Sequence, residues 1–334
     1  MNQRLTIILS MMFGLLLIGI WLYIVDLDAM LVIFKQVKIM FIFPLGACFI
    51  LIYFLRSLRW KIILSPVEKI TITESFHLCM TNYFVNFLIP VHAGEAAKSY
   101  LLKKMKGTPI SKSLWTVYLD KIFDLLPVFL LVVATPFLTK QISKAIYLAS
   151  AILLLVLLFF ISSLVFFIHK KDAALSCSER IFFFLPGRFK GKLRNSISLF
   201  LDGLSSVPRL SNRLFEIIGL TFLALVVHSF FMWLFFYAFG VRLPVLTVFV
   251  GYLLLNASFI LPAPPGFAGS LELIFIFIFS YLYGYDKNIV SAVAASSHLV
   301  TAILFGLVGF WSFAFIGTKL STVLKIESEN SMSL

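Results

Sequence analysis

Eight apolar stretches recur along the chain, and they constrain its fold more than any other feature. They cover residues 5–25, 39–60, 113–137, 146–168, 215–239, 244–261, 267–285 and 289–317. A membrane-spanning helix needs about 20 apolar residues, because the hydrocarbon core is about 30 Å thick. Since 61% of the residues are hydrophobic and only 13% are charged, the sequence predicts an all-α polytopic membrane protein with about eight transmembrane helices plus re-entrant or broken helices.

The basic residues are distributed unequally between the loops that join these stretches. With the N-terminus inside, 21 of the 28 lysines and arginines fall in cytoplasmic segments and six fall in outer loops. Cytoplasmic loops carry an excess of basic residues, so this split predicts a multi-pass protein of the cell (cytoplasmic) membrane with both termini cytoplasmic. Loops facing an anionic leaflet account for the net charge of +13, and no nucleic-acid partner is expected.

A long basic loop divides the chain into two transmembrane halves that we expect to be pseudo-related. The predicted segments are 1–168, 169–213, 214–318 and a short cytoplasmic tail at 319–334. Within the loop, apolar residues repeat at helical spacing between Lys192 and Leu204. This pattern predicts an amphipathic helix on the inner leaflet, with a solvated connector as the alternative.

Each half contains a polar interruption, at 76–105 in the first half and at 256–272 in the second. The residues of interest are Asn82, Asn86, Pro90, His92, Gly94, Glu95 and Lys98 in the first, and Pro262, Pro265, Gly266 and Glu272 in the second. The part at 76–91 is too short and too polar for an ordinary span, so we expect a broken or re-entrant helix. Paired proline and glycine interruptions in two halves are typical of a transport site.

Two acidic residues follow these interruptions and begin apolar helical stretches. Glu95 and Glu272 lie where free N–H groups and the helix dipole favour negative charge. One explanation is that each merely stabilises the first turn of its helix. The other is a function in transport, which the high cost of a charge at membrane depth favours.

A second pair of acids lies on one face of a predicted span. Asp120 and Asp124 are four residues apart, and Arg56 and Arg59 share a face of another span. The aspartates could form ion pairs with these arginines, bind a cationic head group or relay protons. Asn82 and Asn86 are also four apart, and hydrogen bonding between helices without substrate is the alternative to a transport role for them.

The histidines and cysteines do not indicate a metal site. His92, His228 and His298 are scattered, and no pair has the spacing of metal ligands. Each is expected to be a hydrogen-bonded polar residue, and His298 lies in a locally polar stretch. We therefore predict no metal and no cofactor.

These motifs resemble the flippase-like transmembrane family that includes the membrane region of lysylphosphatidylglycerol synthase. Members have an asparagine followed by Pro-x-x-x-Gly-Glu and a basic residue, an acidic-basic-x-x-Asp motif, Pro-x-x-Pro-Gly with a later glutamate, and an Arg-Trp pair. The matching residues here are Pro90, Gly94, Glu95 and Lys98, then Asp120 and Asp124, then Pro262, Pro265, Gly266 and Glu272, and Arg59 with Trp60. The resemblance covers nearly the whole chain.

The sequence departs from the family at three positions. Members often have arginine or glycine where His92 and Ala93 lie, and an arginine where His298 lies, so head-group preference is expected to differ. The synthase also carries a soluble aminoacyl-transferase domain after its membrane region. No motif of such a domain is present here, so transferase activity is not expected.

The resemblance implies a lipid translocase. Its substrate would be a phosphate-bearing amphipathic lipid, such as an aminoacylated phospholipid or a polyprenyl-linked lipid, moved between leaflets. The alternatives are a membrane enzyme or enzyme subunit in aminoacyl-phospholipid or lipid-linked glycan metabolism, and a structural membrane partner without substrate.

Overall fold

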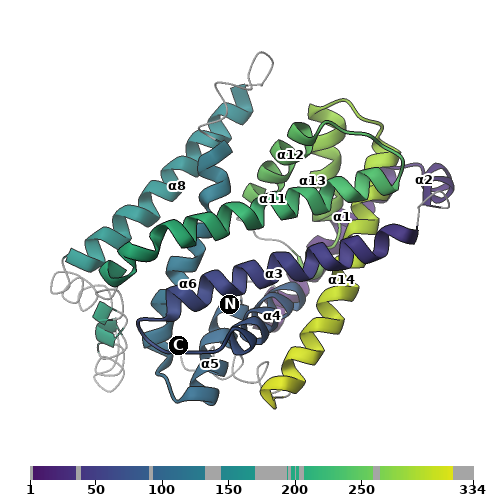
Figure 1. The fold of residues 1–334 in the computed structure, drawn as a ribbon. Helices are drawn as coiled ribbons and strands as arrows, with labels where there is room; N and C mark the ends of the chain where they lie inside the picture. The colour runs from purple at the N-terminus through teal and green to yellow at the C-terminus, as the bar shows by residue number, and fades with distance from the viewer. Residues whose placement is uncertain are drawn as a thin grey trace. The chain divides into compact units, whose positions relative to one another are not determined.

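The computed structural model describes residues 3–34, 39–89, 93–131, 144–169, 194, 197–199, 201–202, 207–258 and 264–318. Within this part of the chain every regular element is a helix (Figure 1). The elements are α1 (Gln3–Ile24), α2 (Leu27–Phe34), η1 (Ile39–Phe41), α3 (Ile42–Leu64), α4 (Ile72–Leu88), α5 (Ala93–Lys106), α6 (Ile110–Asp124), α8 (Lys144–His169), η2 (Val207–Arg213), α11 (Leu214–Ala238), α12 (Val245–Ser258), η3 (Pro265–Phe267), α13 (Ser270–Phe275), η4 (Ile276–Leu282) and α14 (Lys287–Ile316).

Helices occupy all eight of the predicted apolar stretches. Among the described residues, three helices are long and apolar enough to cross a membrane, namely Ile42–Leu64, Leu210–Ala238 and Lys287–Ile316. Shorter apolar helices cover Met11–Ile24, Leu154–Ser163, Val245–Ser258 and Ser270–Leu282. The protein is therefore an all-α polytopic membrane protein, as the sequence predicts.

One predicted span is divided. The stretch at 113–137 contains α6, which ends at Asp124, and a further helical stretch at 126–131. Pro127 lies in the first turn of that stretch. It has no N–H to bond the carbonyl four residues earlier, so the helix is interrupted just before it.

Both predicted interruptions are helix breaks. α4 ends at Leu88 and α5 begins at Ala93, whereas α12 ends at Ser258 and is followed by η3 and α13. Three predicted site residues, Pro90, His92 and Pro262, lie outside the described residues. The remaining site residues are all described.

The start of α4 is fixed by a capping box. The Thr71 Oγ1 accepts from the Glu74 N–H at 3.2 Å, and Glu74 Oε2 accepts from the Thr71 N–H at 2.8 Å. This reciprocal pair satisfies two N–H groups at the helix start. With this capping box, α4 begins at Ile72. The segment predicted from hydropathy, 76–91, begins four residues later.

Contacts within the chain define two compact units, each built from separated segments. The first comprises Met1–Phe54, His77–Ala97 and Leu223–Leu334. In it, α14 packs against α2, α13 and η4, and α1 packs against η3 and α13. Gly269 has a φ of +76°, and a Cβ built there would lie 2.5 Å from the Ile18 N atom. Only glycine therefore lets α1 approach the second break so closely.

The second unit comprises Leu55–Phe76 and Lys98–Phe222. α6 packs against α8 in it. Its apolar core consists of Ile62, Ile63, Trp115, Leu119, Ile122, Leu201, Leu210 and Ile217. Ile197 packs against this core and Leu201 belongs to it, so these two residues of the predicted amphipathic stretch contact protein. Leu193, Phe200 and Leu204 of that stretch lie outside the described residues.

Candidate functional site

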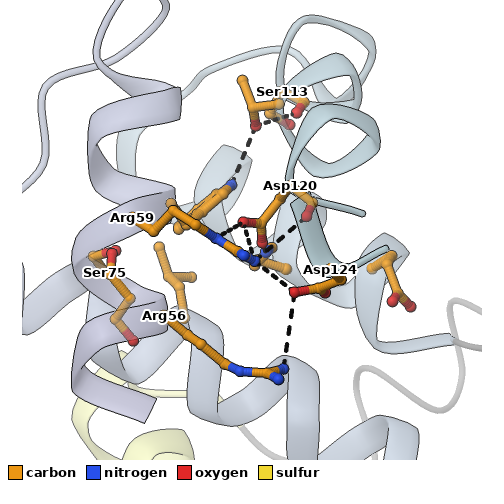
Figure 2. Close-up of polar contacts among 12 residues, drawn as sticks. Arg56, Arg59, Ser75, Ser113, Asp120 and Asp124 are labelled. Carbon is orange, nitrogen blue, oxygen red and sulfur yellow. Dashed lines mark hydrogen bonds and ion pairs between the residues drawn. The ribbon is translucent and has the colours of Figure 1, made fainter. Parts of the chain in front are cut away.

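An arginine of α3 lies between two aspartates of α6 in the second unit (Figure 2). The Arg59 Nε donates to Asp120 Oδ1 at 2.8 Å, and its NH2 group donates to Asp124 Oδ1 at 2.7 Å. Its NH1 group donates to Thr221 Oγ1 at 3.3 Å. The Arg59 side chain is only 2% exposed, so this guanidinium is a buried charge held by two carboxylates.

The helical spacing produces this arrangement. Asp120 and Asp124 are four residues apart on α6, and a helix places residues at that spacing on one face. Both carboxylates can therefore reach a single guanidinium, whose planar fork of N–H groups presents several donors. Of the alternatives open from sequence, an ion pair with arginine is the one seen in the structure.

A lysine of α5 completes the cluster. The Lys98 Nζ lies 3.5 Å from Asp120 Oδ2 and 4.3 Å from the centroid of the Trp60 ring. The Trp60 side chain is fully buried, and its Nε1 donates to Thr116 Oγ1 at 3.2 Å. Thr116 in turn donates to the Ser113 carbonyl at 2.6 Å. The tryptophan face thus stabilises a buried ammonium through a cation–π contact.

Figure 2 shows Arg56 joined to Asp124 by a single dashed line. Its NH1 group is 4.0 Å from Asp124 Oδ1, and the two side chains are 16% and 22% exposed. We call Arg56, Arg59, Lys98, Asp120 and Asp124 the ionic cluster. It combines three cationic side chains with two carboxylates.

A second polar group lies at the first break, in the first unit. The Gly94 N–H donates to Asn86 Oδ1 at 2.7 Å, and Asn86 Nδ2 donates to Glu95 Oε1 at 3.2 Å. The Asn86 amide therefore joins the last turn of α4 to the first turn of α5. Glu95 lies in that first turn, where the helix dipole favours a carboxylate.

Gly94 is required by the close approach of α4. A Cβ built at this position would lie 2.1 Å from the Asn82 carbonyl oxygen and 2.7 Å from Asn82 Oδ1. No larger residue fits unless one helix moves. Asn82 is 4% exposed, and its Oδ1 has no hydrogen-bond partner in the part of the chain that the structure describes.

A third polar group lies at the second break, also in the first unit. The His298 Nδ1 is 2.6 Å from Glu272 Oε1, and its Nε2 is 2.5 Å from the Gly266 carbonyl oxygen. The Glu272 side chain is 6% exposed, and its Oε2 has no hydrogen-bond partner among the described residues. His298 thus connects α14 to both η3 and α13.

The two breaks meet through an aromatic ring of α4. The Phe87 ring lies edge-on to the His298 imidazole, with centroids 6.0 Å apart and an interplanar angle of 83°. A Cβ built on Gly266 would lie 3.8 Å from Phe87 Cζ. Pro265 begins η3 beside this contact.

The predicted site residues thus fall into three groups. The ionic cluster contains the predicted aspartates, both arginines and Lys98, while Glu95 and Glu272 belong to the groups at the breaks. The partner of Glu272 is His298. That partner is 26 residues away, and no sequence pattern pairs the two.

Sequence reasoning missed several residues of these groups. Trp60 contacts Lys98, and Thr221 contacts Arg59. The Arg-Trp pair was visible in the sequence, but its role depends on α5, which is distant along the chain. Glu74 was also missed, although the Thr-x-x-Glu spacing of its capping box is a readable signal.

Glu74 forms an ion pair outside the apolar spans. Its Oε1 lies 2.7 Å from Lys106 Nζ. Burial raises the pKa of the Glu74 carboxyl, but hydrogen bonds from Lys106 and Thr71 outweigh this effect, and the pKa lies below its ordinary value. The pair connects the start of α4 to the end of α5.

Comparison with known proteins places these groups inside a recognised region. The chain matches the family described as "Lysylphosphatidylglycerol synthase TM region" over residues 6–309. It is also 25% identical over 292 residues to a UPF0104 membrane protein of Methanothermobacter thermautotrophicus, covering 81% of this chain and 82% of that protein. No solved structure matches the chain. The matched region includes every residue of the three groups.

Proposed function

Because the chain belongs to the family of lysylphosphatidylglycerol synthase transmembrane regions, we propose that it is a lipid translocase of the flippase-like type. Its substrate is a phosphate-bearing amphipathic lipid, either an aminoacylated phospholipid or a polyprenyl-linked lipid. The observation that carries this proposal is the buried ionic cluster, in which three cationic side chains contact two carboxylates within apolar helices. Basic side chains are the groups that bind phosphate in proteins.

The cost of burying charge supports a functional origin for this cluster. A single basic or acidic residue at the centre of a membrane helix costs about 2.5–3.5 kcal/mol on insertion scales. Charged side chains kept at this cost within apolar helices are typical of substrate or ion pathways. In our proposal the phosphate of the lipid joins the cluster for part of the transport cycle.

Accessibility indicates where the phosphate first binds. Arg56 is the most exposed cation of the cluster, and its separation from Asp124 is the longest, at 4.0 Å. A phosphate offers more oxygen acceptors than one carboxylate oxygen, and arginine binds it through two parallel hydrogen bonds. In our proposal the phosphate contacts Arg56 first and then competes with Asp120 for Lys98, while the acyl or prenyl chains stay in the bilayer.

Reconstitution into vesicles tests the proposal. Vesicles containing the purified protein would carry fluorescent phosphatidylglycerol, lysyl-phosphatidylglycerol or a polyprenyl phosphate, and dithionite would quench the label in the outer leaflet. We expect one or more of these lipids to become fully quenchable with unchanged mass. A changed lipid mass would instead support the membrane-enzyme alternative.

A lysine pair on one helix provides the matched control. Lys98→Gln removes the buried cation of α5, whereas Lys103→Gln removes an exposed cation of the same helix. We expect Lys98→Gln to slow translocation at least tenfold and Lys103→Gln to leave it unchanged. Equal translocation rates in the two variants would show that the lipid does not use the ionic cluster.

A further inference from the structure

The contacts of His298 determine how many protons the group at the second break holds. A carbonyl oxygen only accepts hydrogen bonds, so the Nε2 atom, 2.5 Å from the Gly266 carbonyl, must carry a hydrogen. Nδ1 lies 2.6 Å from Glu272 Oε1. Two unprotonated atoms would repel at this distance, so one more proton lies between them. It is either on the ring, giving imidazolium and carboxylate, or on the carboxyl, giving two neutral groups.

Both arrangements have the same net charge of zero. Removing the shared proton would place two lone pairs 2.6 Å apart and leave one negative charge on a side chain that is 6% exposed. The second carboxyl oxygen of Glu272 is buried and has no hydrogen-bond partner among the described residues to stabilise that charge. The observed geometry is therefore the proton-loaded state of the pair.

In the part of the chain that the structure describes, the other groups in contact with the pair are the Gly266 carbonyl and the Phe87 ring, and neither ionises. From α1, the atoms that approach the second break belong to Gly14, Leu17 and Ile18, none of which ionises. From α4, the ring of Phe87 faces the imidazole. From α5, the acid is Glu95, whose Oε1 accepts from Asn86.

The other elements packed against α13 and α14 place their ionisable residues elsewhere. α12 contributes Tyr252, which accepts from Asn256 and stacks on His228. η4 contributes Tyr281, which is 80% exposed. At the start of α14, Asp286 is the N-cap and Lys287 is the first residue, and Asp28 lies in the first turn of α2. That end of α14 is about three turns from His298.

We propose that Glu272 and His298 form a binding site for one exchangeable proton, and that loading and unloading of this site drives lipid movement. This inference rests on the proposed lipid translocation. In each cycle the pair, with neutral imidazole and carboxylate, takes one proton from one side of the membrane and later releases it to the other. No electrons move and no bond other than that to the proton changes. When the proton leaves, the Glu272 carboxylate is a buried negative charge. In our proposal the movement of the lipid removes this unfavourable state.

Two variants separate proton binding from structure. Glu272→Gln offers an amide N–H to Nδ1 just as a protonated carboxyl does, so it keeps the loaded geometry but cannot release the proton. His298→Gln removes the ring that shares it. His228→Gln is the control, because His228 is another partly buried histidine of the same unit and its ring stacks on Tyr252.

The transport test imposes a pH gradient across vesicles in which a potassium ionophore clamps the membrane voltage. With one proton per lipid, the steady-state ratio of labelled lipid between the leaflets should change about tenfold for each unit of pH gradient. A trapped pH indicator should report proton movement only when substrate lipid is present. Both effects should be lost in Glu272→Gln and His298→Gln and retained in His228→Gln.

Infrared difference spectroscopy gives a readout that does not depend on transport. Spectra of the purified protein at low and high pH should contain carboxyl or imidazole bands that disappear in Glu272→Gln and His298→Gln. Absence of these bands from the wild-type spectra would overturn the proton site. A wild type that moves lipid equally with and without the gradient would overturn the coupling but leave the translocase. A wild type that moves no lipid would overturn the proposed function, and the coupling with it.

Discussion

Replacing Arg59 with methionine tests whether the ionic cluster holds the second unit together. Methionine keeps much of the length of the arginine stem but has no charge and no N–H donor. Asp120 and Asp124 would lose contacts of 2.7 to 2.8 Å, and the side chains left beside them would be Lys98 at 3.5 Å and Arg56 at 4.0 Å. Breaking a buried ion pair by removing one partner costs about 3–5 kcal/mol of folding free energy.

Arg56→Met is the matched control for this variant. It makes the same substitution on the same helix, three residues away, and changes the net charge by the same amount. Since Arg56 is more exposed and its ion pair is 4.0 Å long, its loss should cost at most about 1 kcal/mol. The two variants should therefore differ by roughly 2–4 kcal/mol.

Unfolding by sodium dodecyl sulfate in mixed micelles provides the assay. The helical circular dichroism signal would be followed against the detergent fraction for the wild type and both variants. Arg59→Met should unfold at a clearly lower fraction than Arg56→Met. Adding Asp120→Asn and Asp124→Asn to Arg59→Met should restore part of the loss, because no carboxylate would then remain uncompensated. Equal midpoints for the two single variants would refute the reasoning.

Three further predictions concern other parts of the chain. Gly94→Ala should destabilise the protein by about 1–3 kcal/mol, because its Cβ would lie 2.1 Å from an α4 carbonyl oxygen. The lowered pKa of Glu74 means that its ion pair with Lys106 stabilises the fold above the unfolded pKa of about 4.3, and this contribution is lost as the pH falls through the folded pKa. Single cysteines at Ser176 and Gln141 should be labelled from opposite sides of the membrane, if 169–213 is cytoplasmic.

Each of these predictions has a control or a contradicting result. Gly219→Ala lies in α11 with no atom within 4 Å of the built Cβ, so it should stabilise slightly, and a loss as large as in Gly94→Ala would contradict the steric argument. Lys106→Gln should lower stability by up to about 1 kcal/mol at neutral pH, and by progressively less as the pH falls through the folded pKa of Glu74. A loss that does not shrink as the pH falls would exclude the ion pair as its cause. Labelling of both cysteines from one side would contradict the predicted topology.

Local sequence patterns were sufficient to predict most of the fold. Long apolar runs predicted the positions of the spans because a bilayer leaves helices few alternatives. Pro90 and Gly94 marked the first break, where α4 ends at Leu88 and α5 begins at Ala93. Helical spacing also placed Asp120 and Asp124 on one face, which is why their shared arginine partner could be anticipated.

The contacts of the site that could not be predicted from the sequence are contacts between segments far apart in the chain. The pairing of Glu272 with His298 and the stacking of Lys98 on Trp60 are set by how helices pack, and no periodicity encodes them. The requirement for glycine at position 94 likewise arises from the backbone of α4. The start of α4 was misplaced for another reason, since its capping box contributes little to hydropathy.

The most direct test of the translocase compares two fluorescent lipids in vesicles containing the wild-type protein. They share the same chains and label, but one carries an anionic phosphate head group and the other is the matching diacylglycerol. We expect the phosphate-bearing lipid to cross much faster than in vesicles without protein, and the rate to fall at least tenfold in Lys98→Gln. The diacylglycerol should cross at the same rate with and without protein. If the phosphate-bearing lipid crosses no faster with protein than without it, the account of this protein as a lipid translocase is wrong.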